Sequence, residues 1–203
     1  MQVNLKKIDI RFIVLIALIL FAASMRIFNV ANITNKEFAQ FSPLAAMCLF
    51  GGSSFSKHWK AILFIIATLF VSDICIQQMV YHGKYGFIYN GWYLVYAVFI
   101  LITLMGKWLI KKVTLQNVLI ASVIAVGTHW LIMDFTVWLS GGIDIRTNLP
   151  LSRDFKGLTQ CYIQGWPFAK NLLAGTLVYS GLFFGVYTWV STKVKVKHLA
   201  YAK

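Results

Sequence analysis

The sequence is poor in charge, and above all in acidic residues. Only 12% of its 203 residues are charged, and 6 Asp and Glu stand against 19 Lys and Arg. A soluble domain usually carries about 25% charged residues, and a soluble fold of this length would leave much of a 59% hydrophobic chain exposed. A bilayer accepts such a surface, because lipid takes the place of a core. The composition therefore excludes an ordinary soluble domain and predicts a single all-α integral membrane domain over 1–203.

Cysteine and catalytic motifs are also scarce. Cys48, Cys75 and Cys161 lie far apart without a CxxC spacing, which excludes a zinc ribbon and a disulfide framework. The sequence has no GxSxG, HExxH or P-loop motif, and it has no tandem repeat or low-complexity segment. These absences argue against an enzyme, and we expect neither a metal site nor an intrinsic cofactor.

Long apolar runs dominate what is present. A spanning helix needs about 20 mostly apolar residues. Pro43 suits the first position of the short second helix, and Gly51 with Gly52 marks its end. The first run resembles a signal peptide, but it continues beyond the small residues at 22–24, so we expect an uncleaved helix. The runs predict a six-transmembrane-helix bundle with helices at about 8–28, 41–55, 59–80, 87–109, 115–139 and 167–190.

The basic residues set the orientation. A net charge of +13 also suits a nucleic-acid-binding protein, but the basic residues cluster in the connections, where topology signals belong. We therefore expect the lipid bilayer as a partner and no nucleic acid. The set of connections that includes both termini holds twelve of the 19 basic residues, so it should face the cytoplasm of a bacterial inner membrane. The twelve are Lys6, Lys7, Arg11, Lys57, Lys60, Lys107, Lys111, Lys112, Lys193, Lys195, Lys197 and Lys203; the other seven are Arg26, Lys36, Lys84, Arg146, Arg153, Lys156 and Lys170.

Polar residues inside the apolar runs gather in the predicted outer half, where they are costly and usually functional. Trp130, Asp134 and Trp138 are four residues apart and share one helical face, an arrangement that suits an aromatic pocket with a carboxylate between the rings. Alternatively, both Trp residues belong to an interfacial belt and Asp134 pairs with a basic residue.

Asp73 leaves the same two alternatives open. It is a candidate binding residue, or it forms a structural ion pair with Arg26 or Arg153. The connection at 140–166 is the longest, and a loop of that length is usually functional or disordered. Its aromatic residues argue against disorder, so we expect a lid over an outward-facing pocket. The full set of candidate binding residues is Arg26, Asp73, Asp134, Trp138, Arg153, Cys161, Tyr162 and Asn171.

Two stretches resemble an uncharacterised family of small bacterial six-helix membrane proteins. They are FSPLAAMCLFGG at 41–52, followed by Ser72 and Asp73, and GLTQCYIQGWPFAKNLLAG at 157–175, followed by Tyr179 and Gly185. That family is in turn similar to the substrate-binding S components of ECF (energy-coupling-factor) vitamin transporters, which have six helices and an outward pocket capped by loops. The resemblance implies binding and uptake of a vitamin-like molecule, with a cobalamin or a flavin-like compound as the candidate ligand.

One feature departs from that pattern. S components that dock on the shared coupling subunit carry Ala-xxx-Ala in the first helix, whereas Ala17, Ala22 and Ala23 do not form it here. This argues against docking on an ECF coupling module and leaves a solitary transporter. Solitary cobalamin transporters ligate cobalt through a cysteine, and Cys161 is the candidate thiolate by that resemblance; the alternative is a packing residue.

Two other classes of function stay open. One is a membrane-embedded enzyme that uses Asp73, Asp134 and His129 as acid–base groups. The other is a structural or assembly subunit, for which a fully packed outer half would be the indication.

Overall fold

The computed structural model describes residues 10–31, 40–55 and 57–200, and the regular secondary structure of this part of the chain is helical apart from one small hairpin. The strands β1 (Ile143–Asp144) and β2 (Leu149–Pro150) pair antiparallel between the last two helices. Lys6, Lys7, Lys36, Lys203 and the start of the predicted first helix lie outside the described residues. The helices are α1 (Ile10–Ala31), α2 (Leu44–Ser54), α3 (His58–Cys75), the π-helical turn η2 (Ile76–Val80), α4 (Trp92–Leu109), α5 (Leu115–Leu139) and α6 (Phe155–Ala200).

Four helical segments in the described residues are long and apolar enough to cross a membrane. They are α3 with η2, α4, α5 and the part of α6 that ends at Thr192. This finding indicates an integral membrane protein. α2 has only 11 residues and is about 16 Å long, so the expectation of a spanning helix at 41–55 was wrong in length. The predicted helix at 87–109 begins only at Trp92, because Gly91 turns the chain with a φ of 82°.

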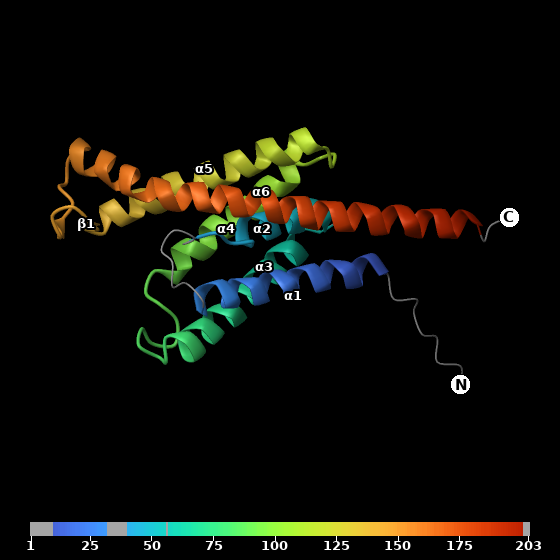
Figure 1. Ribbon diagram of the computed structural model, residues 1–203, viewed down its shortest axis with the longest axis horizontal. Helices are drawn as coiled ribbons and strands as arrows, with labels where there is room; N and C mark the ends of the chain where they lie inside the picture. The colour runs from blue at the N-terminus through green and yellow to red at the C-terminus, as the bar shows by residue number, and fades with distance from the viewer. Residues whose placement is uncertain (1–9, 32–39, 56, 201–203) are drawn as a thin grey trace.

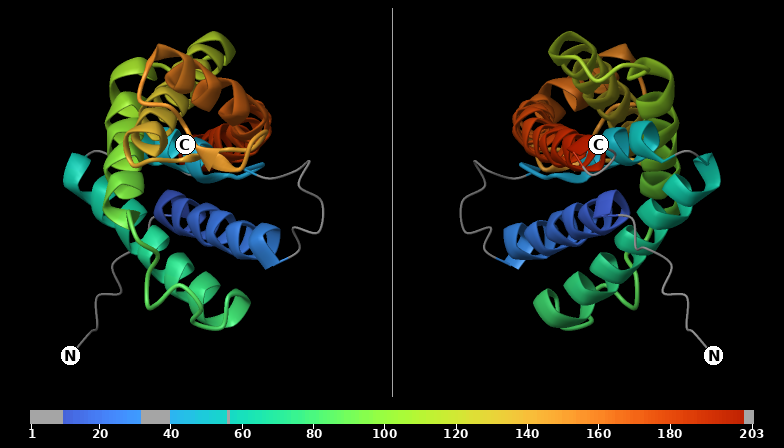
Figure 2. Two further views of the ribbon diagram at one scale, coloured as in Figure 1. Left: turned by 90° about the vertical axis from the view of Figure 1, so that its left-hand side faces the viewer. Right: turned by 90° about the vertical axis from the view of Figure 1, so that its right-hand side faces the viewer.

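α2 lies at the centre of the bundle. It contacts each of the other five α-helices in the described part of the chain, and every residue from Leu44 to Gly52 is buried. Seen along the bundle, α5 and α6 lie on one side of the molecule and α1 and α3 on the other (Figure 2). The start of α1 and the end of α6 share one end of the bundle, and the β-hairpin lies at the opposite end, called here the hairpin end (Figure 1).

The backbones of α2 and α4 pack closely through glycine. A Cβ atom at Gly52 would lie 1.8 Å from the Thr103 carbonyl oxygen, and one at Gly106 would lie 2.5 Å from the Leu49 carbonyl oxygen. Small residues allow such approach in membrane helix pairs. Gly52 therefore does not mark the end of its helix, as the sequence indicated, but the place where α4 crosses it.

α6 begins earlier than the sequence suggested. It starts at Phe155 rather than at 167, so the predicted lid loop at 140–166 comprises the β-hairpin and the first turns of α6. The Asp154 carboxylate caps the helix by accepting the backbone N–H of Gly157 at 2.8 Å. Pro167 lies inside α6, where the missing N–H bends a helix, and the ribbon changes direction in its orange part (Figure 1).

Candidate functional site

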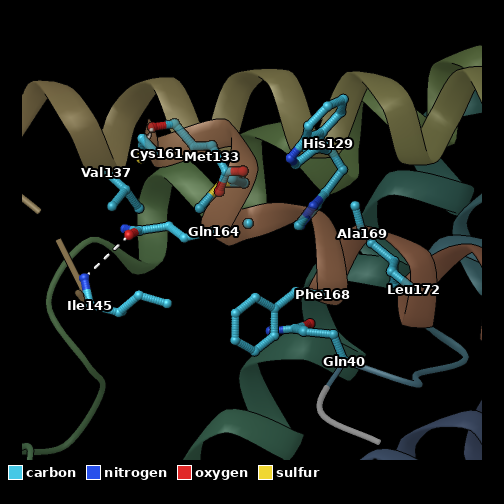
Figure 3. A pocket seen from close by; sticks show the side chains of 13 residues that line it. Gln40, His129, Met133, Val137, Ile145, Cys161, Gln164, Phe168, Ala169 and Leu172 are labelled. Atoms are coloured by element: carbon cyan, nitrogen blue, oxygen red, sulfur yellow. Dashed lines mark hydrogen bonds between the residues drawn. The ribbon is translucent and has the colours of Figure 1, made fainter. Parts of the chain in front are cut away.

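A cavity of about 420 Å³ lies between α5 and α6 near the hairpin end; it is called the α5–α6 cavity below. Figure 3 shows Val137, Met133 and His129 following one another along α5, with Gln164 and Phe168 of α6 across the hollow. Gln40 and Ile145 complete the wall from two other segments. The lining residues are Gln40, His129, Trp130, Met133, Asp134, Val137, Ile145, Cys161, Gln164, Gly165, Phe168, Ala169 and Leu172.

Helical spacing explains why there is room between these two helices. Cys161, Gly165 and Ala169 of α6 are four residues apart, so three small side chains occupy one face toward α5. Trp130 and Asp134 have the same spacing on α5. The small residues on this face of α6 therefore leave the space, and Gln164, Phe168 and Leu172 complete the α6 wall.

The Asp134 carboxyl group is the main polar group of this cavity. Its Oδ2 is inaccessible to solvent and has no hydrogen-bond partner among the described residues, and the same holds for Trp130 Nε1. The indole interacts with the carboxyl group, but its geometry falls short of a hydrogen bond. A Cβ atom at Gly165 would lie 1.8 Å from Oδ2. A buried acceptor without a donor costs about 1–3 kcal/mol, so the cavity suits a molecule that supplies one.

The β-hairpin is fastened over the α5–α6 cavity by Gln164. Its Nε2 donates to the Ile143 carbonyl oxygen at 3.0 Å, and its Oε1 accepts the Ile145 N–H at 3.3 Å. Within the hairpin, Arg146 donates to both oxygens of Asp144, at 3.0 and 2.6 Å. These bonds hold the pKa of Asp144 below its ordinary value and keep the turn closed at neutral pH.

Cys161 lies in the cavity wall, where its thiol is already engaged. The Sγ atom donates to the Asp134 carbonyl oxygen at 3.2 Å, so it joins α6 to α5. This hydrogen bond between the two helices favours the packing alternative for this cysteine.

The other candidates of this half lie outside the α5–α6 cavity. Trp138 Nε1 donates to the Ser152 carbonyl oxygen at 2.9 Å, and Arg153 Nη1 donates to that of Leu139 at 2.5 Å. Tyr162 donates to the Leu131 carbonyl oxygen at 3.0 Å and lines a shallow aromatic hollow beside the cavity. Asn171 is half-buried on α6 and interacts within the chain. Three of these four thus hydrogen-bond to backbone carbonyls, and the predicted Trp130–Asp134–Trp138 trio is divided.

Asp73 belongs to a different polar cluster, between α1, α3 and α4. Arg26 forms an ion pair with its Oδ1 and also donates to Ser72 Oγ. Tyr96 donates to its Oδ2 at 2.7 Å. Asp73 is only 2% exposed, and each of its carboxylate oxygens has a donor. The structure therefore contains the ion pair that the sequence left open, with Arg26 rather than Arg153 as the partner.

Three neighbouring cavities form a row across the hairpin end. One of about 440 Å³, called here the tyrosine cavity, is lined by Arg26, Asp73 and Gln77 together with Tyr81, Tyr85 and Tyr89. A linking cavity of about 330 Å³ shares Arg26 and Tyr89 with it and shares Gln40, His129 and Met133 with the α5–α6 cavity. The hairpin end is therefore hollowed from α1 to α6.

Non-helical backbone forms part of the floor of this row. Gln40, Phe41 and Ser42 line the linking cavity just before α2 begins, and Asn29 Nδ2 donates to the Phe41 carbonyl oxygen at 2.8 Å. At membrane depth, such backbone occurs only where protein buries it or where it lines a cavity. The short α2 is thus preceded, toward the hairpin end, by a non-helical segment that faces the hollow.

The sequence missed several lining residues that carry no charge. Gln40, Met133, Gln164, Gly165 and Phe168 are all part of the α5–α6 cavity. The four-residue spacing of small residues on α6 was the available indication. The same spacing recurs further along α6 at Gly181 and Gly185, but these glycines are exposed, and a Cβ atom at either position would meet nothing within 4 Å.

Comparison with known proteins adds one assignment. The family of unknown function DUF6580 matches residues 6–199. The chain belongs to DUF6580. Neither the curated proteins nor the solved structures gave a match. The resemblance to a family without known function is thereby confirmed, while the further similarity of this DUF6580 member to ECF S components has no support from the comparisons.

Proposed function

We propose that this DUF6580 protein binds a small, mainly apolar molecule in the α5–α6 cavity and serves as a membrane binding or uptake protein for a vitamin-like compound. One observation carries the proposal: the buried Asp134 Oδ2 without a partner among the described residues, in a largely apolar cavity. Ligand sites usually combine apolar walls with a few polar groups that fix orientation. Asp134 would accept a hydrogen bond from the ligand or pair with a cationic group on it.

Cavity size narrows the ligand class. A volume of about 420 Å³ lies toward the small end of the range of about 300–1,000 Å³ for ligand cavities. It favours a molecule the size of one fused ring system, such as a flavin-like ring, over a whole corrinoid. A cobalamin would have to extend into the linking cavity, and the engaged thiol of Cys161 supports packing rather than cobalt ligation.

The same proposal places the hairpin end outside a bacterial inner membrane. Support comes from the distribution of basic residues, with twelve of 19 in the connections on the side of the termini. The start of α1 and the end of α6 share one end of the bundle (Figure 1), as an even number of crossings requires. The row of cavities then opens outward, and both termini lie in the cytoplasm.

The short α2 also supports an uptake role. Transporters commonly form their sites from discontinuous helices and cavity-lining backbone near mid-membrane. Here α2 begins at Leu44, below the non-helical residues of the linking cavity. We therefore propose an S-component-like six-helix transporter. It would act alone, because the first helix lacks the Ala-xxx-Ala docking pattern.

The decisive experiment identifies what co-purifies with the full-length protein. Mass spectrometry and absorbance spectra of the detergent-purified wild type should show a bound compound that Asp134→Ala loses. Thr136→Ala, which alters the same helix outside the cavity lining, is the matched control and should retain the compound. Equal retention of the compound by Asp134→Ala and Thr136→Ala would show that Asp134 does not bind it.

A second candidate function, acid–base catalysis, has one specific observation in its favour. His129 and Asp134 line the same cavity, whereas Asp73 lies in another and is held by Arg26. An enzyme would thus use two of the three groups that the sequence suggested. Turnover of the co-purified compound by the purified protein would favour catalysis, and its recovery unchanged would favour uptake. The hollow hairpin end counts against a purely structural subunit.

A further inference from the structure

Gln77 is a buried polar residue that the proposed Asp134 site does not use. It is 4% exposed, it lines the tyrosine cavity, and its Oε1 has no hydrogen-bond partner among the described residues. A buried carbonyl oxygen without a donor is unfavourable by about 1–3 kcal/mol. An unpaired Oε1 in a cavity wall therefore points to a hydrogen-bond donor on a molecule that binds in the cavity.

The backbone around Gln77 is distorted in a way that presents this side chain. η2 is a π-helical turn at the end of α3, and such turns are rare and frequent at functional sites. Tyr81 N–H donates to the Ile76 carbonyl oxygen at 3.1 Å, and Gly83 N–H donates to that of Gln77 at 2.8 Å. The backbone carbonyl oxygen of Gln77 thus has a hydrogen-bond donor, whereas its side-chain Oε1 has none among the described residues.

The rest of the tyrosine cavity is lined by the three tyrosines, by the aliphatic Val30 and Ile76, and by an ion pair without net charge. Arg26 and Asp73 neutralise one another in their ion pair. Tyr81 and Tyr85 lie with ring centroids 5.4 Å apart in an edge-to-face arrangement, and Tyr89 is shared with the linking cavity. Aromatic walls favour planar rings, and a carboxamide oxygen accepts an N–H, as Gln does from the amino group of adenine.

We propose that the tyrosine cavity is a second binding subsite, which takes an uncharged planar heteroaromatic ring with an N–H donor. Gln77 Oε1 accepts that N–H, and the tyrosine rings pack against the faces and edges of the ring. The subsite is distinct from the Asp134 cavity and stands whether or not Asp134 binds a ligand, because different residues line it.

The test uses 2-aminopurine, a fluorescent ring whose emission falls when it stacks on an aromatic side chain. Titration of the full-length protein in detergent should quench the probe. Gln77→Leu should weaken binding about fivefold, the loss expected for one neutral hydrogen bond. Gln78→Leu makes the same change at the exposed neighbour and should bind like the wild type.

Three results would overturn the subsite. The first is absence of quenching by the wild type, and the second is equal affinity of Gln77→Leu and Gln78→Leu. The third is a loss in Asp134→Asn as large as that in Gln77→Leu, which would place the probe in the α5–α6 cavity. A competition experiment on the wild type tests the same hydrogen bond even if Gln77→Leu fails to fold. 9-methylpurine, which lacks an N–H, should displace the probe about fivefold less well than adenine. Equal competition would contradict the role of Gln77.

Discussion

Asp73 and Asp134 are both carboxylates in apolar helices near the hairpin end, but their surroundings differ. Asp73 forms an ion pair with Arg26 through one oxygen and accepts a hydrogen bond from Tyr96 on the other. Asp134 has an oxygen with no partner in the described part of the chain and an open cavity beside it. The comparison teaches that polarity inside a membrane helix does not by itself mark a binding site. A group with a complete set of partners stabilises the fold, and an incomplete set leaves an interaction for a ligand.

The largest expected effect is on the stability of the Asp73 cluster. Asp73→Ala leaves the Arg26 guanidinium buried without its counter-ion, and we expect a loss of about 3–5 kcal/mol in the free energy of unfolding. Denaturant unfolding in detergent measures it. Replacing both partners, with Arg26→Met and Asp73→Leu, should recover most of that loss. If Asp73→Ala were as stable as the wild type, the ion pair would contribute little to the stability of the fold.

The opposite result is expected at Asp134. Asp134→Asn keeps the size of the side chain and removes no hydrogen bond to Oδ2, so the free energy of unfolding should change by less than about 1 kcal/mol. Retention of the co-purifying compound should nevertheless be lost. If Asp134→Asn unfolded as readily as Asp73→Ala, the distinction between the two aspartates would fail.

A smaller effect should follow from moving the Asp134 carboxyl group without changing it. Gly165→Ala places a Cβ atom where Oδ2 lies, and the flexible carboxyl end has to shift. We expect about a tenfold weaker affinity, equal to about 1.4 kcal/mol, with the fold intact. Gly181→Ala, on the same helix with open space around it, is the matched control. Unchanged affinity in Gly165→Ala would mean that the carboxyl position is not critical.

The smallest effect concerns the start of α6, which carries one wall of the cavity. Bonds from Ser152 and from the Gly157 N–H hold the pKa of Asp154 below its ordinary value of 3.8. The cap is therefore fully formed above that value and is lost as the pH falls through the lower pKa of the folded state. The protection of the Gly157 amide against exchange, relative to an open amide at the same pH, should fall below about pH 4.

Asp154→Asn supplies the control for that pH effect. Asn caps helices about as well as Asp but does not titrate, so its Gly157 exchange should follow the ordinary pH dependence of a closed amide. An identical acid response in the two proteins would assign the opening to another group.

The sequence predicted helices well where one apolar run has clear ends. α5 occupies Leu115–Leu139, the range expected, because Thr114 caps it by accepting the Asn117 N–H at 3.2 Å. α6 was misjudged, because Pro167 was taken as the start of a helix. Prolines are tolerated inside membrane helices, where neighbouring groups satisfy the freed carbonyls, so the residue alone does not separate a start from a bend.

The candidate site was only partly predictable, because partners are chosen in three dimensions. Asp134 was found from its chemistry and Cys161 through the family resemblance, and they line one cavity. Arg26 and Asp73 are 47 residues apart, and no spacing rule could decide between Arg26 and Arg153 as the partner. Gly165 and Gln77 were missed, because a glycine matters here through the space it leaves, and a glutamine at a helix end looks like an ordinary boundary residue.

The length and position of α2 have a consequence for how the protein is assembled. An 11-residue helix is too short to be stable alone in lipid, and its contacts are with all five other α-helices of the described chain. It gains a stable environment only after helices distant in sequence have gathered around it, so its docking should be the last step of folding. The floor of the cavities would then form only on the completed bundle, and partly assembled protein would not bind a ligand there.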